Sequence, residues 1–241
     1  MTDAHCHIAA NDEARHFICR EPSESAADFL PSRDLLFRGI HPWQTLNVTN
    51  PAAFISERLE PFLVDLPRHF SNADEPLAGI GEIGLDRLKC RDVSPLMREV
   101  FERQLKAAAD LKCPVILHGA KCWGQVVAAC KPYKGIIPHF LFHGFSRSDG
   151  LIPDIIALNG FISVGAAVLN DHATNYRELV KKIPLDRLLL ETDRTESTAT
   201  DSPRLEAIAD AVAYIRNMTL AALLEATESN ASKFNCQRSR L

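Results

Sequence analysis

The side chains of this sequence best suited to chemistry are histidines and carboxylates that recur along the whole chain. The first two are His5 and His7, in the segment from Thr2 to His7. Alternate side chains of a β-strand share one face, so these two imidazoles can hold one metal ion together. A lone pair of this kind also fits two polar residues near a chain terminus. Metal binding is favoured because metal-type residues also close four later apolar, strand-like runs: Glu82, His118, His143 and Asp193.

Neutral imidazoles combined with carboxylates suit Zn²⁺, Mn²⁺ and related divalent ions. Two such ions need a bridging group, and Glu82, on a central strand, is best placed to bridge. Ions in such a site lower the pKa of a bound water, which supplies hydroxide near neutral pH. Asp193 ends the last strand and is predicted to contact a metal and to act as general base. The pattern therefore predicts a hydrolase with two divalent metal ions, in which Asp193 and Glu82 are the catalytic carboxylates.

Apolar, β-like runs that alternate with helical patterns would position these residues. Strands are predicted at 2–7, 17–20, 35–40, 77–82, 115–118, 136–143, 161–164 and 188–193, and helices at 23–30, 51–62, 95–112, 123–131, 151–158, 175–182, 203–216 and 220–234. This alternation indicates a parallel sheet. A length of 241 residues is typical of one α/β barrel. We therefore expect an α/β fold, a distorted (β/α)8 TIM-type barrel, as a single domain over residues 1–241.

In TIM-type barrels the active site lies at the C-terminal ends of the strands, where all of the ligand candidates fall. His41 also follows a strand, and it is predicted either to contact substrate phosphate or to cap the turn before Pro42. Four loops carry a cation shortly after a ligand: Arg87, Lys121, Arg147 and Arg194. Because these loops leave the same end of the barrel, their cations are predicted to form a basic rim that binds phosphate. The alternative is four solvated surface charges.

Composition and charge limit the classes of protein to which this chain can belong. A net charge of −4 and an isoelectric point of about 6.1 exclude a generally basic nucleic-acid-binding surface. The sequence has no apolar run of about 18 residues and no basic-then-apolar order at its start, so we expect a cytoplasmic protein that does not enter a membrane. Its seven cysteines lack Cys-x-x-Cys spacing and are predicted to be reduced thiols. No obligate protein partner is evident.

Six short motifs, taken in order, resemble those of the TatD family of metal-dependent hydrolases, which belong to the amidohydrolase-like barrels. They are Asp3-x-His5-x-His7, Gly39-Ile40-His41-Pro42, Gly81-Glu82-Ile83-Gly84-Leu85-Asp86, Leu117-His118, His143-Gly144-Phe145-Ser146 and Glu191-Thr192-Asp193. The resemblance covers nearly the whole chain and implies a metal-dependent deoxyribonuclease. It further implies the ligands of each metal: His5, His7, Glu82 and Asp193 for one, and Glu82, His118 and His143 for the other.

The sequence departs from the common pattern of that family at two places. Ala120, followed by Lys121, stands where an arginine is often found, and Arg194-Thr195-Glu196 replaces a small residue followed by proline. Both departures bear on the substrate more than on the metals. Asp3 and Asp86 are candidates to orient the ligands, because the second ring nitrogen of a metal-binding histidine usually needs a partner.

Three functions fit the same residues. The leading one is cleavage of phosphodiester bonds in DNA, as single strands or at strand ends. The second is hydrolysis of a different ester, amide or lactone by the same metals. The third is a non-catalytic barrel whose metals are structural and whose surface binds a partner. The presence of both Glu82 and Asp193 disfavours the third, because a structural site needs fewer ligands and no open position.

Overall fold

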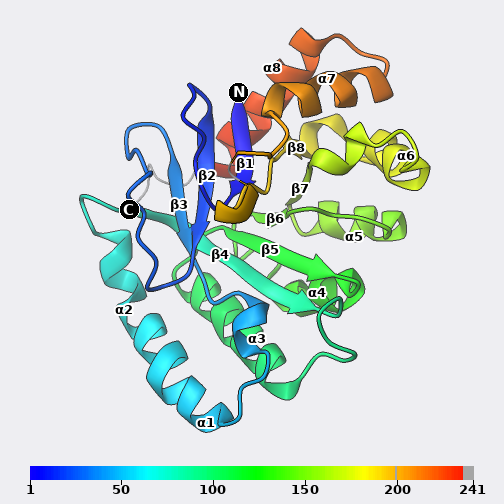
Figure 1. Cartoon of the computed structure of the whole chain (residues 1–241). Coiled ribbons are helices and arrows are strands. Elements are labelled where there is room, and N and C mark those ends of the chain that lie inside the picture. Colours follow the sequence, from blue (N-terminus) through cyan, green and yellow to red (C-terminus); the bar gives the residue numbers. More distant parts are fainter. Residues whose placement is uncertain (199, 236–241) are drawn as a thin grey trace.

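The computed structural model describes residues 1–198 and 200–235, and its centre is a sheet of eight parallel strands in chain order (Figure 1). The strands are β1 (Thr2–Cys6), β2 (Arg15–Arg20), β3 (Leu35–Arg38), β4 (Leu77–Asp86), β5 (Val115–Ala120), β6 (Phe140–Phe142), β7 (Gly160–Val164) and β8 (Leu188–Leu190). The sheet closes just beyond β8, where the Asp193 N–H donates to the His5 carbonyl at 3.0 Å and the His7 N–H donates to the Arg194 carbonyl at 2.7 Å. The predicted (β/α)8 barrel is confirmed, and its closing contacts lie at the ligand-bearing end.

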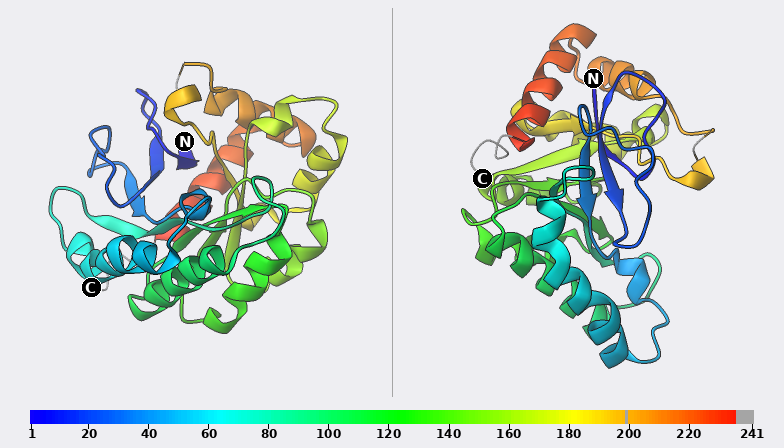
Figure 2. Two further views of the ribbon diagram at one scale, coloured as in Figure 1. Left: turned by 60° about the horizontal axis from the view of Figure 1, so that its bottom comes forward. Right: turned by 90° about the vertical axis from the view of Figure 1, so that its left-hand side faces the viewer.

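Helices cover the outside of the barrel from the third strand onward (Figure 2). They are α1 (Pro51–Phe54), α2 (Glu60–Phe70), α3 (Pro95–Asp110), α4 (Trp123–Cys130), α5 (Ile152–Ala157), α6 (Thr174–Lys182), α7 (Leu205–Ile215) and α8 (Leu220–Asn235), with a π-helical turn, Ile55–Leu59, joining α1 to α2. The connections β1–β2 and β2–β3 contain no helix in this fully described part of the chain. The barrel is therefore distorted on its N-terminal side.

The helix predicted at 23–30 is wrong, because that segment forms turns. Two buried arginines from neighbouring strands bind carbonyl oxygens of this segment and of the two residues before it. The Arg38 guanidinium donates to the carbonyls of Glu21, Pro22 and Glu24, and Arg20 Nε donates to that of Ser25. Carbonyl oxygens turned toward these guanidinium groups are not aligned along a helix axis, so tertiary contacts override the local helical pattern.

The inward side chains of the strands fill the barrel at the end opposite the ligands. Phe17 and Phe37 pack there with Phe161, and the Phe234 ring from α8 lies 5.6 to 6.1 Å from each of these three rings. The helix α8, red in Figure 2, thus seals one mouth of the barrel. At the other mouth a cavity opens over the candidate ligands.

Glycines in β4 let this strand lie close to β5. At Gly84, where φ is +155°, an added Cβ would lie 2.0 Å from the His118 carbonyl oxygen. At Gly79 it would lie 2.2 Å from the Pro114 carbonyl oxygen. These glycines thus permit a close approach of the two backbones. It carries β4 on to Asp86, beyond the predicted end at Glu82, and brings Glu82 and Asp86 beside His118.

Within the described residues no single helix is long and apolar enough to cross a membrane, although the bent pair α7 and α8 passes that test when counted together. The cysteines of this part of the chain, Cys6, Cys19, Cys90, Cys113, Cys122 and Cys130, are free. Cys236 lies outside the described residues.

Candidate metal centre

Glu82 is the centre of the candidate site, and its two oxygens face two different groups of histidines. Oε2 lies 3.5 Å from His5 Nε2 and 3.3 Å from His7 Nε2. Oε1 lies 2.6 Å from His118 Nδ1 and 2.5 Å from His143 Nε2. A carboxylate whose oxygens point to separate sets of imidazoles has the arrangement of a bridging ligand. The structure therefore brings together all of the residues predicted as ligands, with Asp193 beside the first group.

The distances around His5 fit a tetrahedral metal shell. Metal–ligand bonds of about 2.1 Å place neighbouring tetrahedral ligand atoms about 3.4 Å apart. His5 Nε2 lies 3.4 Å from Asp193 Oδ1 and 3.5 Å from Glu82 Oε2, and His7 Nε2 lies 3.9 Å from Asp193 Oδ1. His5 Nε2 is also buried without a hydrogen-bond partner among the described residues. An unpaired buried nitrogen is costly, and a bound cation would satisfy it.

The electrostatics of the site match a cation-binding centre. Burial opposes ionisation of Glu82, but the surrounding imidazoles, His143 foremost, hold its pKa well below the usual value. Burial also opposes a charge on His143, yet the Glu82 carboxylate outweighs it and raises the pKa of His143 to about 10. The buried Glu82 carboxylate thus favours positive charge on the groups that face it.

Asp86 fixes the proton position on His118. Its Oδ2 accepts a hydrogen bond from His118 Nε2 at 3.0 Å and another from the Trp43 indole N–H at 2.7 Å. A carboxylate only accepts, so Nε2 carries a proton, and Nδ1 is the ring nitrogen left to bind a metal. The role expected of Asp86 is confirmed in its geometry. Asp3 accepts hydrogen bonds from the Thr192 N–H at 2.9 Å and Oγ1 at 2.6 Å, so it contacts the residue before Asp193 rather than a histidine of the cluster.

His41 joins the cluster but presents a donor. Its Nε2 lies 3.6 Å from Glu82 Oε1 and 3.4 Å from His118 Nδ1. Its Nδ1 accepts a hydrogen bond from the Trp43 backbone N–H at 3.2 Å, and burial lowers its pKa. A neutral imidazole that accepts at Nδ1 carries its proton on Nε2. The hydrogen bond therefore assigns His41 an N–H donor directed at the metal centre.

The segment after β8 is shaped to present Asp193. This residue has φ of +53°, a left-handed conformation that aspartate adopts more readily than most residues. The hydrogen bonds from Thr192 to Asp3 anchor the preceding residue, and the Asp193 N–H donates to the His5 carbonyl. The Asp193 side chain is 53% exposed, whereas Glu82 is buried. Asp193 can therefore face both the ligands and a substrate.

A cavity of about 750 Å³ opens over the cluster and is lined by His7, His41, Glu82, His118, His143 and Asp193. Of the predicted rim, Arg87 and Lys121 are exposed in the loops after β4 and β5, whereas Arg147 and Arg194 line two other cavities. In the described chain the metal cavity is lined by one lysine or arginine only, Arg20. The structure does not gather the four cations around the metals, and their role in phosphate binding stays a prediction.

Three further residues of the site were not predicted from the sequence. Glu191 is buried with its Oε1 3.6 Å from His143 Nδ1, and it accepts a hydrogen bond from Ser163 Oγ. The Glu21 carboxylate accepts the His41 backbone N–H, and burial raises its pKa to about 7. Trp43 is 46% exposed at the cavity wall. Only the motif around Glu191 could have suggested any of them.

A nearly closed parallel barrel with histidines and carboxylates converging at its open mouth is typical of hydrolases that use divalent metal ions. A family model described as TatD related DNase matches residues 24–235. The chain belongs to the TatD family of metal-dependent hydrolases.

Individual relatives and a solved structure agree with this assignment. The chain is 28% identical over 169 residues to the uncharacterized metal-dependent hydrolase YabD of Bacillus subtilis, covering 67% of this chain and 66% of YabD. It is 34% identical over 126 residues to the 3'-5' ssDNA/RNA exonuclease TatD of Klebsiella pneumoniae, covering 52% of this chain and 48% of that protein. Each match spans less than two thirds of the relative. The fold is similar to YJJV, a TatD homolog from Escherichia coli, with a TM-score of 0.73, 19% identity and coverage of 97% and 96% of the two chains.

Proposed function

We propose that this protein is a metal-dependent deoxyribonuclease that hydrolyses phosphodiester bonds with two divalent ions. The main observation behind the proposal is that the two oxygens of Glu82 face different histidines. Oε2 faces His5 and His7, and Oε1 faces His118 and His143. The Klebsiella pneumoniae relative, named as a nuclease for single-stranded DNA and RNA, supports this class of substrate. Zn²⁺, Mg²⁺ and Mn²⁺ are the candidate ions, and we expect the enzyme to act in the cytoplasm.

The chain's own residues divide the work of such a reaction. His5, His7, Glu82 and Asp193 would hold one ion, and Glu82, His118 and His143 the other. The bound ions would supply Lewis acidity and a water of lowered pKa. Asp193, exposed at the cavity wall, is the group that accepts a proton from the attacking water. His41, with its proton on Nε2, donates to an anionic oxygen of the substrate.

Trp43 gives the metal cavity a surface suited to a nucleobase. The indole N–H is held by Asp86 at 2.7 Å, and the Lys89 ammonium lies 4.8 Å from the ring centroid. The ring is thus fixed in orientation while 46% of the residue stays exposed. Stacking of one base on an aromatic side chain contributes about 1–3 kcal/mol. An oriented, exposed indole beside the metal ligands supports a single-stranded nucleic acid as substrate.

The test is a metal-by-substrate screen on purified protein reconstituted with Zn²⁺, Mn²⁺ or Mg²⁺. Substrates are a single-stranded oligonucleotide, bis(p-nitrophenyl) phosphate and a small neutral ester. We expect hydrolysis of both phosphodiesters and little of the ester. Turnover of the ester alone would favour the hydrolase acting on another ester, amide or lactone. No turnover by metal-loaded protein would favour the non-catalytic binding protein.

Metal content tests the ligands separately from activity. His5→Ala combined with His7→Ala removes two nitrogens from one ion and should release most of one equivalent. His69→Ala, on α2, removes an imidazole outside the cluster and serves as the matched control. Elemental analysis that gives the double variant and the control equal metal content would contradict the assignment.

A further inference from the structure

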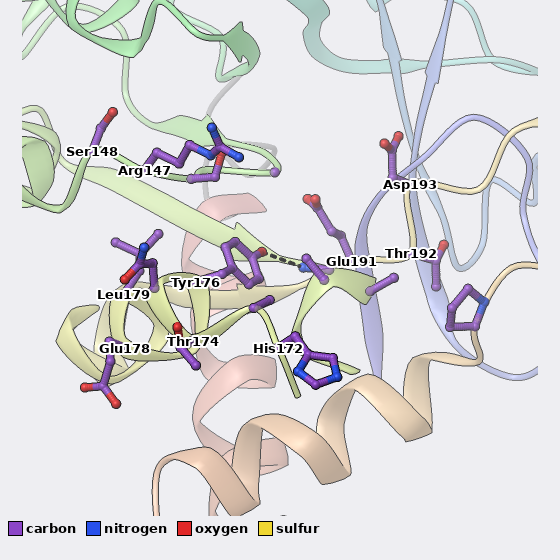
Figure 3. Close-up of a pocket in the computed structure, with 18 of the residues that line it drawn as sticks. Arg147, Ser148, His172, Thr174, Tyr176, Glu178, Leu179, Glu191, Thr192 and Asp193 are labelled. Atoms are coloured by element: carbon purple, nitrogen blue, oxygen red, sulfur yellow. Dashed lines mark hydrogen bonds between the residues drawn. The ribbon is translucent and has the colours of Figure 1, made fainter. Parts of the chain in front are cut away.

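A second cavity has a volume of about 1200 Å³, and Figure 3 shows residues that line it. Arg147 and Ser148, from the loop after β6, lie on one side of it, and Thr174, Tyr176 and Leu179 of α6 on the other (Figure 3). The segment after β8 contributes Glu191, Thr192 and Asp193. The volume exceeds the about 300–1,000 Å³ of ordinary small-molecule sites. The cavity therefore has room for a ligand larger than the group that reacts.

The two cavities share a wall. Asp193 lines both, and Glu191, in the floor of the second, lies 3.6 Å from the proposed ligand His143. Gly144 and Gly165 flank Glu191, since a Cβ at either position would lie 3.5 or 3.2 Å from its side chain. A substrate held at the metals can thus extend past Asp193 into the second cavity.

The walls of the second cavity suit a polar ligand with many hydrogen-bonding groups. Hydroxyl side chains recur around it, among them those of Ser146, Ser148, Thr174, Thr198 and Ser202. Five acidic residues also line it, against two basic ones, Arg147 and Lys182. This excess of carboxylates disfavours a run of several phosphates, which needs clustered cations. Sugar hydroxyls and base amino groups, in contrast, donate hydrogen bonds that carboxylates accept.

Arg147 is the free cation of this cavity. Lys182 is engaged, because its Nζ lies 2.5 Å from Asp149 Oδ2. The Arg147 guanidinium has no hydrogen-bond or ion-pair partner in the described part of the chain. Its backbone has φ of +58°, a left-handed conformation that costs a residue other than glycine about 1 kcal/mol. The loop thus holds an unpaired guanidinium at the cavity in an uncommon conformation, and such conformations cluster at functional sites.

We propose that the second cavity is a nucleotide subsite that binds the part of a single strand next to the cleaved bond. Arg147 binds the neighbouring phosphate, and the sugar and base contact the hydroxyls and carboxylates of the walls. The proposal rests on the proposed nuclease function. It predicts that the second cavity contacts one phosphate of the strand, through Arg147.

Equilibrium binding tests the subsite independently of turnover. The probe is a fluorescein-labelled phosphorothioate oligothymidylate, which resists hydrolysis, titrated with metal-loaded protein and followed by anisotropy at several salt concentrations. Arg147→Gln should weaken binding about ten-fold or more, the effect of losing one charge-assisted hydrogen bond. It should also reduce the slope of log K against log salt concentration by about 1, as for one phosphate contact.

Two further variants distinguish the effect of the Arg147 charge from the effect of the open volume of the cavity. Arg68→Gln removes another exposed cation, from α2, and should change neither the affinity nor the slope. Ala167→Trp, at an exposed position of the cavity wall, keeps every charge but fills part of the volume. It should weaken binding and leave the slope unchanged. Equal affinities of the Arg147→Gln and Arg68→Gln variants, or full affinity of Ala167→Trp, would overturn the subsite.

A small substrate distinguishes this proposal from the nuclease assignment. Bis(p-nitrophenyl) phosphate has no neighbouring phosphate, so Arg147→Gln should lower kcat/KM for an oligonucleotide by a much larger factor than kcat/KM for this small substrate. Equal losses on both substrates would count against the subsite. If wild-type protein hydrolyses neither substrate, the nuclease function fails, and the binding titration still decides whether the cavity takes a single strand.

Discussion

Asp86→Asn should weaken one metal site and spare the other. In the structure Oδ2 of Asp86 accepts from His118 Nε2 and from the Trp43 indole, and Oδ1 accepts from the backbone N–H groups of Leu88 and Lys89 at 2.5 and 2.9 Å. Burial opposes the charge, but these bonds, His118 first, hold the pKa of Asp86 below its usual range. Asparagine has one acceptor and one donor group, so it cannot accept at both positions.

The consequence for His118 follows from this geometry. With the asparagine oxygen retained by the backbone N–H groups, its NH₂ group meets His118 Nε2, which must then become an acceptor. The ring proton moves to Nδ1, the atom that faces Glu82 and would bind the metal. Partners of metal-binding histidines contribute about 10–100-fold to affinity, which is about 1.4–2.7 kcal/mol. His5 and His7 have no contact with Asp86 among the described residues, so their site should be unaffected.

Competition with a chromogenic chelator measures the affinities of the two bound metal ions separately. Wild-type protein should show two binding steps, and Asp86→Asn should lose affinity in one of them by the factor given above. Trp43→Phe, which removes the other donor to Oδ2 and leaves His118 its acceptor, is the matched control. Two unchanged steps in Asp86→Asn, or equal weakening of both, would refute the tautomer argument.

Three further outcomes are expected. Asp193→Asn keeps the shape and tolerates φ of +53°, so activity should fall about 10²–10⁴-fold through loss of the base with metal retained; near-normal turnover would rule out that role. Trp43→Ala should raise KM for a single-stranded oligonucleotide about ten-fold while Trp43→Phe, which keeps a ring, should raise it less; equal KM values for the two variants would exclude stacking. Burial opposes ionisation of Asp34, but hydrogen bonds from His16 and Arg33 lower its pKa from 3.8 to about 2. The folded-state pKa is the lower one, so the carboxylate stabilises the fold above pH of about 4, and the contribution is lost as the pH falls through about 2. Asp34→Asn should therefore lower the free energy of unfolding by about 2 kcal/mol at pH 7 and by less near pH 2, as urea titrations at both pH values would show.

The sequence by itself determined the barrel and the residues around Glu82. Apolar runs that alternate with helical patterns specify parallel strands, and parallel strands place all of their C-terminal ends at one mouth. A histidine or carboxylate that closes such a run, as His118 and Asp193 do, therefore reaches the same site whatever its distance along the chain. Gly79 and Gly84 of β4 let its backbone lie close to β5, because glycine has no Cβ to clash there.

The conformation of the loops that follow the strands, and the direction of their side chains, depend on tertiary contacts. The local pattern predicted a helix at 23–30, but Arg38 and Arg20, from neighbouring strands, bind the carbonyl oxygens of Glu24 and Ser25 in this segment. Four cations that follow ligands in the sequence were predicted to form one rim. In the structure Arg147 and Arg194 line separate cavities, because their loops have different conformations. The proton positions on His41 and His118 depend on hydrogen bonds with Trp43 and Asp86. Hydrogen-bond direction and loop dihedral angles arise from contacts between distant segments, and no residue spacing within one segment encodes them.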